Sequence, residues 1–405
     1  MSVSLAVAAS LVTLALAACS TSTPAEAPAG AEVDAGASAE ASDPDAQDAS
    51  VRPSHAPLPS VTNQHGRVFA QAELVTVTFP RYPYEARVKA FGDWVVGSSW
   101  LHGVCPEYGC GAKSHQSRTL AEEAPPAISP ATLETMLVRL VDAGALPAPS
   151  DDTLFLVYFP AQTVMSILHQ GPTGCDSGSA FHGSVRIGAR LVPYTGVADC
   201  TAHPSSKAMF PKLSAEEIVE VASSHEIIEA LTDPFFPPTP SFLLDDLDSP
   251  WFELGGEVAD WCAGFTAREG EHVVTRVWSN EQAKLGRHPC VPAPADAVYF
   301  NAAPPESKAV SVARGGSVDV PITGWATSPI APWSLRVIQP PVGPNGLAAT
   351  LTLGASTIGD GETVTLHVTV PKDAPPGASR FFMLASGRPE DEWFQTWPMI
   401  VSAKK

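Results

Sequence analysis

Basic residues are scarce in this chain of 405 residues. Its 24 lysines and arginines are outnumbered by 43 aspartates and glutamates, which gives a formal net charge of −19. Binding to nucleic-acid phosphates requires a basic surface, so this balance argues against a nucleic-acid partner.

Several catalytic signatures are also absent. The chain has no G-x-S-x-G nucleophile elbow, no G-x-x-x-x-G-K phosphate loop and no G-x-G-x-x-G dinucleotide loop. After the first residues, no segment is apolar for long enough to span a membrane. The sequence therefore offers no Ser-hydrolase, nucleotide-binding or integral-membrane interpretation.

The first 19 residues read as a secretory signal. Residues 1–18 are almost wholly apolar and lead into Leu16-Ala17-Ala18-Cys19, which resembles the bacterial lipobox, although no Lys or Arg precedes the apolar run. A lipid on Cys19 would anchor the exported protein to the cell envelope, at the outer membrane or cell surface. Ordinary signal cleavage nearby is the alternative.

Residues 20–66 are expected to form a disordered linker. The segment is acidic and rich in Ala, Pro and Ser, and it cannot bury enough apolar surface to offset its ordering entropy.

Six cysteines remain after Cys19, and an even number in an exported chain favours disulfides. Proximity along the chain suggests the pairs Cys105–Cys110, Cys175–Cys200 and Cys262–Cys290, out of 15 pairings that six cysteines allow. A structural zinc site is the competing interpretation, but there is no C-x-x-C pair.

Two folded domains are predicted. Residues 67–295 carry these cysteines and mix strand-like runs at 75–79, 153–159 and 190–195 with helical spacing at 131–144, which indicates an α/β or α+β domain. The run at 153–159 is expected to be a buried central strand, and Pro193 favours an edge position for 190–195. Residues 305–402 contain about seven short β-like runs separated by turns, the pattern of an Ig-like sandwich.

The most informative segment is a helix that begins at a Ser214-x-x-Glu217 capping box and ends near Pro234. His225 and Glu229 are four positions apart, so both can reach one metal ion. Glu226 occupies the position of the general base in H-E-x-x-H metallopeptidases, while Glu229 replaces their second histidine.

A second acidic segment follows. In thermolysin-like zinc enzymes a later helix supplies a glutamate ligand and an aspartate that orients a ligand histidine, and Glu257 and Asp260 suit these roles. His225, Glu229 and Glu257 would then hold an ion such as Zn²⁺, Mn²⁺ or Ca²⁺. If His182 also points in, the second nitrogen favours zinc.

A structural interpretation stands beside this one. His-Glu-x-x-Glu occurs often by chance, and a buried histidine bonded to a carboxylate can belong to the core. In that case the helix is braced by a polar network, and the Ig-like domain binds a glycan or protein partner.

Taken together, these segments resemble a known family. Residues 224–234, 256–262 and 274–280, with Phe181-His182-Gly183, are similar to the EXORDIUM-type secreted proteins of plants and their bacterial relatives, many of them lipid-anchored. The resemblance covers most of residues 68–292. It implies a secreted, disulfide-bonded, zincin-like α/β domain whose motif residues are His225, Glu226 and Glu229, with Glu257 and Asp260 downstream. This chain departs from the family around Phe181-His182, where relatives more often place a cysteine before the glycine.

The sequence thus predicts a surface lipoprotein with a zinc-dependent, peptidase-like hydrolase site. Glu226 and Asp260 are the candidate catalytic residues, and the expected ligand is a peptide or a cell-envelope molecule. A non-catalytic surface protein is the alternative.

Overall fold

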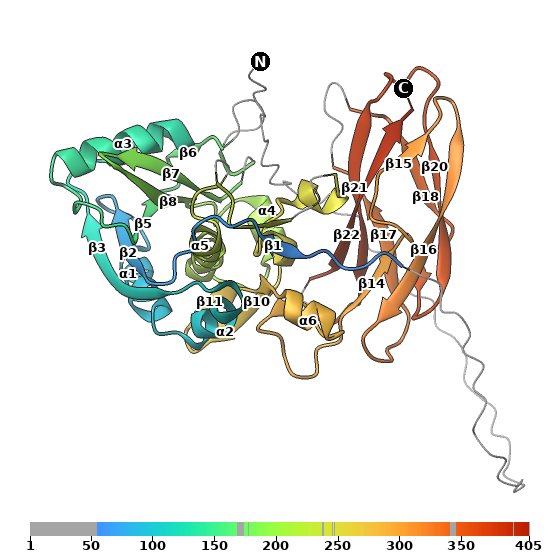
Figure 1. Ribbon diagram of the computed structural model, residues 1–405, viewed down its shortest axis with the longest axis horizontal. Coiled ribbons are helices and arrows are strands. Elements are labelled where there is room, and N and C mark those ends of the chain that lie inside the picture. The colour runs from blue at the N-terminus through green and yellow to red at the C-terminus, as the bar shows by residue number, and fades with distance from the viewer. Residues whose placement is uncertain are drawn as a thin grey trace, which may run out of the picture.

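The computed structural model describes residues 55–404 except 168–173, 177, 237–238, 245, 247, 341–345 and 392. The predicted signal peptide, Cys19 and residues 20–54 of the predicted linker lie outside this range. The described residues form a mixed α/β domain followed by an all-β domain (Figure 1). Within them, no helix has both the length and the apolar character to cross a membrane.

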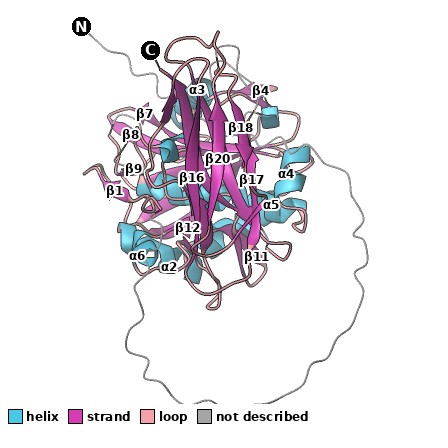
Figure 2. Ribbon diagram, turned by 90° about the vertical axis from the view of Figure 1, so that its right-hand side faces the viewer, coloured by secondary structure: helices cyan, strands magenta, loops and turns pink. Residues whose placement is uncertain are grey.

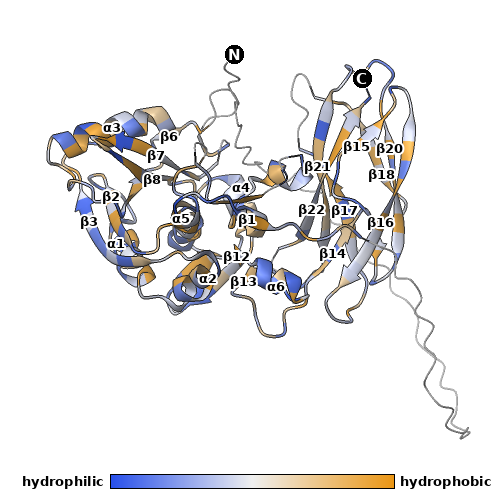
Figure 3. Ribbon diagram, viewed as in Figure 1, coloured by the Kyte–Doolittle hydropathy of each residue, from blue (hydrophilic) through white to orange (hydrophobic). Residues whose placement is uncertain are grey.

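A five-stranded mixed sheet is the centre of the α/β domain. Its strands lie in the order β3 (Ala112–Thr119), β2 (Ala72–Thr78), β5 (Thr153–Phe159), β8 (Arg190–Ala198) and β7 (Ala180–Ile187). The first four are parallel, and β7 pairs antiparallel with β8. Figure 3 shows hydrophilic colour on β3, one edge of the sheet, and hydrophobic colour on β8 inside it.

Strand β5 is buried on both faces, which confirms the predicted central strand. Phe155 and Val157 pack in the apolar cluster on the side of α3 (Pro130–Asp142). Leu154 and Leu156 pack in the opposite cluster with α1 (Glu85–Val95) and α5 (Ala215–Thr232). Because alternate side chains enter two cores, the strand reads as a continuous apolar run.

The expectation that residues 190–195 form an edge strand is wrong. β8 lies between β5 and β7, and β7 is the edge. Pairing of β8 with β5 begins at Tyr194, one residue after Pro193, so the missing N–H of the proline does not interrupt that ladder.

The other elements of the α/β domain are short. Three are helices: α2 (Ser99–Tyr108), α4 (Pro204–Met209) and α6 (Asn280–Lys284). Three are 3-10 turns: η1 (Gly174–Asp176), η2 (Pro250–Leu254) and η3 (Asp260–Cys262). The remaining strands form four pairs: β1 (Val61–Asn63) with β9 (Phe242–Leu244), β4 (Ala127–Ile128) with β6 (Val164–Met165), β10 (Thr266–Glu269) with β11 (His272–Thr275), and β12 (Val277–Trp278) with β13 (Cys290–Val291).

Helix α5 begins as predicted. The Ser214 hydroxyl accepts a hydrogen bond from the Glu217 amide, and the Ser214 amide donates to the Glu217 carboxylate at 2.7 Å. The rest of the helix is enclosed on nearly every side, because the sheet covers one face and β11 another.

Buried polar groups fix α5 against its neighbours. The Glu220 carboxylate lies 2.6 Å from Arg87 Nε on α1 and 2.6 Å from His272 Nδ1 on β11. The amide of Thr275 donates to the Ser224 hydroxyl at 2.8 Å. Since a buried carboxylate without partners is costly, these contacts determine both the position and the rotation of the helix.

All three predicted disulfides are confirmed. Cys105–Cys110 closes the end of α2, Cys175–Cys200 ties η1 to the segment after β8, and Cys262–Cys290 links η3 to β13. Such bonds are typical of exported proteins.

The all-β domain consists of two facing sheets. One has the order β14 (Phe300–Ala303), β16 (Ser317–Ala326), β20 (Thr363–Thr369) and β18 (Thr350–Leu353); the other has the order β15 (Val310–Val312), β22 (Gln395–Ala403), β21 (Ser379–Gly387), β17 (Trp333–Ile338) and β19 (Thr357–Ile358). Figure 2 views the molecule from this side. The sandwich starts at β14, ahead of the predicted boundary at residue 305, because Phe300 to Ala303 pair with β16.

The two domains share one continuous apolar cluster. The ring of Trp251 on η2 meets Trp397 on β22 edge-to-face, with centroids 5.2 Å apart, and also contacts Trp261 at 5.6 Å. Large aromatic surfaces buried in this way hold the domains together firmly.

The first described residues also join the domains, so residues 55–66 are a correction to the predicted disordered linker. The His55 ring stacks on Trp325 of the sandwich at 3.9 Å, and the Ala56 amide donates to the Pro304 carbonyl. The chain then crosses to the α/β domain, where β1 pairs with β9 (Figure 1). Backbone pairing supplies the order that the composition of this segment does not predict.

His288 is buried at the same interface. Its Nδ1 accepts a hydrogen bond from the Cys290 amide at 3.2 Å, and its Nε2 lies 3.2 Å from the Gln395 side-chain amide of β22. Burial lowers the pKa of His288 from 6.5 to about 4, and nearby Arg276 adds to the effect, against weaker opposition from Asp391.

We expect this histidine to make folding stability pH-dependent. The unfolded chain takes up the proton first as pH falls, so the free energy of unfolding should drop between about pH 6.5 and 4, by about 3 kcal/mol at most. A His288→Asn variant, which keeps an acceptor, should show a flatter profile in urea unfolding over this range. Parallel profiles for the two proteins would contradict the assignment.

Candidate metal centre

Three parts of the chain bring ionisable side chains together. Helix α5 supplies His225, Glu226 and Glu229, and the edge strand β7 supplies His182. The turn between η2 and η3 supplies Glu257, and η3 begins with Asp260. All of the site residues predicted from the sequence therefore lie in one region.

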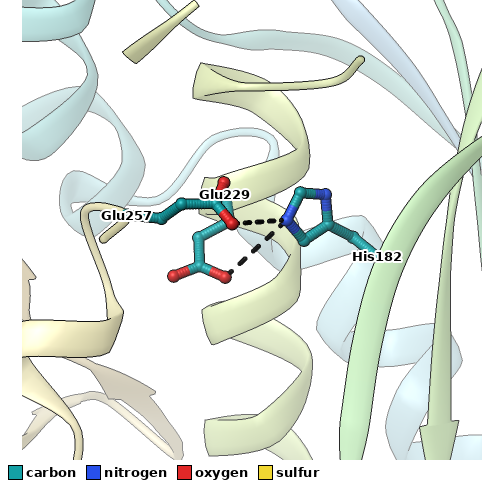
Figure 4. Close-up of side chains that lie close together, drawn as sticks. All are labelled: His182, Glu229 and Glu257. Carbon is teal, nitrogen blue, oxygen red and sulfur yellow. Dashed lines mark hydrogen bonds and ion pairs between the residues drawn. The ribbon is translucent and has the colours of Figure 1, made fainter. Parts of the chain in front are cut away.

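The first group is His182, Glu229 and Glu257, whose ligand atoms lie within 4.8 Å of one another. His182 Nε2 is 3.1 Å from Glu257 Oε2 and 4.0 Å from Glu229 Oε2 (Figure 4). The second nitrogen of the ring and Glu257 Oε1 are buried without a hydrogen-bond partner among the described residues. Orphaned buried polar atoms of this kind suit an additional ligand or ion.

The second group is His225, Glu229 and Asp260, and it meets the same 4.8 Å limit. His225 Nε2 is 3.3 Å from Glu229 Oε1 and 3.6 Å from Asp260 Oδ1. Glu229 Oε1 also accepts a hydrogen bond from the Ala259 amide. Glu229 thus belongs to both groups, with one oxygen toward each histidine.

This geometry revises the predicted ligand set of His225, Glu229 and Glu257. Among the described residues, no such group unites His225 with Glu257: His225 contacts Oε1 of Glu229, whereas Glu257 is grouped with His182, which contacts Oε2. Asp260 approaches the same ring nitrogen of His225 as Glu229 does. An orienting carboxylate would hold the other nitrogen, so Asp260 lies in a ligand position.

Glu257 lies in a turn between η2 and η3, whereas the corresponding glutamate of thermolysin-like enzymes lies on a helix. Glu257 follows Gly255 and Gly256, which have φ values of 121° and 95°. A Cβ on Gly255 would lie 1.9 Å from Asp260 Oδ2, so only glycine lets the turn close on the aspartate. The Asp260 carboxylate in turn accepts the Glu257 amide at 3.1 Å, and the two acidic side chains are held by a turn.

The separations suit an ion. Ligands bound at ~2.0–2.2 Å to one tetrahedral centre lie about 3.5 Å apart. The distances of 3.1 and 4.0 Å in the first group and of 3.3 and 3.6 Å in the second bracket this value. Both groups combine one imidazole with two carboxylates, a donor set for a divalent metal.

The two histidines are strongly affected by their neighbours. Burial disfavours the imidazolium form of His182, but the Glu257 and Glu229 carboxylates outweigh it and raise its pKa to about 10. At His225, burial is outweighed by Glu229 and Asp260, and the pKa rises well above its usual value. The surroundings therefore favour a positive charge on both histidines, and a divalent cation can replace these two charges.

The pKa values of the buried carboxyl groups at the site shift in different directions. Burial raises the pKa of Glu226 to about 8 and that of Glu257 to about 8, and it raises the pKa of Asp260 as well. Burial acts the same way on Glu229, but His225 and His182 overcome it, so that the pKa of this central carboxyl is lowered. Perturbation of several groups at one place is characteristic of functional sites.

A cavity of about 200 Å³ opens beside the second group. Its wall includes His225, Glu226 and Asp260. His225 is one of the few half-buried residues in the middle of α5, since its neighbours along the helix are fully enclosed. The His225 side of the site therefore faces space for a ligand.

Two features of the site were not predicted from the sequence. Asp233, read as part of a helix end, is fully buried; its Oδ1 accepts the Ser241 amide, and burial raises its pKa to about 6. The sandwich supplies Trp393, Phe394 and Met383 to the cavity wall beside the site. Local sequence gives no signal for contacts between segments so far apart.

Comparison with known proteins gives little guidance. No protein-family model and no curated protein matches the chain. A family 123 glycoside hydrolase from Clostridium perfringens is similar over 23% of this chain and 22% of its own, with 11% identity and a TM-score of 0.16. The surface layer protein SbsC, domains 1–6, is similar over 34% of this chain and 16% of its own, with 18% identity and a TM-score of 0.19.

The titin M3 domain is similar over 27% of this chain and 97% of its own length, with 16% identity and a TM-score of 0.16. The chain spans less than a quarter of the glycoside hydrolase and of the surface layer protein. At these TM-scores, function has to be inferred from the residues of the site itself.

We expect Glu229 to be required for metal binding. Because its two oxygens serve both groups, Glu229→Gln should weaken Zn²⁺ binding by at least about tenfold to a hundredfold, the loss typical even of outer ligand partners. Equilibrium dialysis followed by elemental analysis measures this. Glu216→Gln, an exposed residue of the same helix, is the matched control.

Single substitutions of the histidines separate the two groups. His182→Asn should affect only an ion held with Glu257, and His225→Asn only one held with Asp260. Zinc binding by Glu229→Gln at wild-type affinity would contradict both sites.

Proposed function

We propose that this protein is an exported, metal-dependent hydrolase that acts on amide bonds. The observation that carries the proposal is the meeting of one divalent-ion donor set, His225, Glu229 and Asp260, with the buried carboxyl of Glu226 at the wall of a cavity. Zinc is the first candidate, and two carboxylates in the set also admit manganese or calcium.

A divalent ion, when bound, supplies Lewis-acid polarisation of the carbonyl group and activation of water. Glu226 then accepts the proton of the attacking water and passes it to the leaving nitrogen. Its place next to His225 and its exposure of only 4% keep it in a low-dielectric setting, where burial brings its pKa near the working range of a general base.

The predicted relationships fit this proposal. A zincin-like arrangement would make the site catalytic, with a peptide or cell-envelope molecule as substrate. The resemblance to EXORDIUM-type proteins and a lipid on Cys19 would place the protein at the cell envelope and imply no activity of their own. The three disulfides support an oxidising compartment outside the cytoplasm.

A second candidate function rests on a different observation. The charges at the site already pair with one another, and Glu229 holds the backbone of Ala259. Such a network can brace α5 in a non-catalytic surface protein whose Ig-like domain binds a glycan or protein. Protein that is fully folded and binds no metal after mild refolding would favour this function.

We expect Glu226→Gln to separate catalysis from metal binding. Loss of the base should lower turnover of a mixed fluorogenic peptide library by about 10²–10⁴-fold. The zinc content should stay at the wild-type level, because Glu226 belongs to neither ligand group. Glu216→Gln serves again as the control, and unchanged turnover in Glu226→Gln would rule out this residue as the base.

A further inference from the structure

The cavity beside the metal centre lies between the two domains. Figure 1 shows α5 between the five-stranded sheet and the sandwich. The inner wall comes from α5 and the turn that holds Asp260, and it includes Val221, Ala222 and Trp261. The outer wall comes from the sandwich, through Met383 of β21, Thr396 of β22 and the aromatic pair Trp393 and Phe394 ahead of β22.

The aromatic pair is built firmly into the sandwich side. The rings of Trp393 and Phe394 stack with centroids 4.3 Å apart, and the Arg336 guanidinium lies 4.9 Å above the Phe394 ring. Across the domain boundary, Trp393 rests directly on Gly264, where a Cβ would lie 2.5 Å from the indole. Gly264 has a φ of 93°, so its conformation and the close approach both require glycine.

The lining is largely apolar, and its ionisable members belong to the wall formed by α5 and η3. Ile218, Phe210, Met209 and Phe265 add to the apolar surface, while the ionisable members are His225, Glu226 and Asp260. Binding sites commonly combine an apolar cavity with a few convergent polar groups. A ligand in this cavity would place an apolar portion against the sandwich and a polar portion at the metal centre.

The volume limits what that apolar portion can be. An apolar cavity of about 150 Å³ accepts a benzene molecule, whereas whole drug-sized ligands occupy about 300–1,000 Å³. The cavity of about 200 Å³ therefore matches a single ring or a branched aliphatic side chain.

We infer that this cavity is the subsite for an aromatic or bulky aliphatic side chain of the substrate, and that Trp393 and Phe394 make the sandwich a part of the substrate-binding site. This inference rests on the proposed hydrolase function, because it names the substrate class of the same site. Trp393 and Phe394 are specificity-determining residues, and the chemistry stays with the α/β domain.

Binding of small amides tests the inference with the full-length protein. The probes are N-acetyl-4-fluorophenylalanine amide and N-acetyl-3-fluoroalanine amide. Their binding is measured by ¹⁹F NMR line broadening, once with zinc-loaded protein and once with chelator-treated protein. The aromatic probe should bind at least about tenfold more tightly than the small one.

Two variants attack the cavity from opposite walls. Ala222→Phe fills the cavity from α5, and Trp393→Ala removes part of the sandwich wall. Each substitution should weaken binding of the aromatic probe by about tenfold or more. Ala143→Phe, an exposed alanine after α3, is the matched control and should leave binding unchanged. Circular dichroism and thermal midpoints establish that the variants are folded.

The outcomes separate this inference from the proposed function. Equal binding of both probes, or unchanged aromatic binding in folded Ala222→Phe, overturns the subsite even if zinc binds and peptides are cleaved. Aromatic binding that depends on both walls, in a protein that binds no metal, supports the subsite and overturns the hydrolase.

Discussion

The buried carboxylate of Glu229 is the interaction on which the site depends. It lies in the middle of an enclosed helix, and each of its oxygens faces one histidine. Such a charge is tolerated only with partners, and these are His182 of β7, His225 of the same helix and the amide of Ala259. The edge strand, the motif helix and the double-glycine turn are therefore brought together around one side chain.

Much of this arrangement could be predicted from local sequence. The Ser214 capping box, the two-sided burial of β5 and the three disulfides follow from capping chemistry, apolar content and proximity, and the structure confirms each of them. His225 and Glu229 converge because helical spacing places residues four apart on one face. These features depend on neighbours in the chain.

What the sequence did not predict depends on distant contacts. The interior place of β8 follows from where its pairing with β5 starts, and the division of the ligands into two groups follows from the side from which β7 approaches α5. Glu257 lies in a tight turn because the φ of Gly255 and the room needed by Asp260 admit no Cβ at that position. The sandwich wall of the cavity required the docking of two domains, which no local pattern reveals.

The route of the first described residues has a mechanical consequence. His55 stacks on Trp325 and Ala56 bonds to Pro304 before the chain reaches β1. Tension applied to the polypeptide ahead of residue 55 therefore acts first on the sandwich. The β1–β9 pair bears the load only after the contacts of His55 and Ala56 have broken. Such a load would spare α5 and its charged cluster until the contacts of His55, Ala56 and β1 had broken.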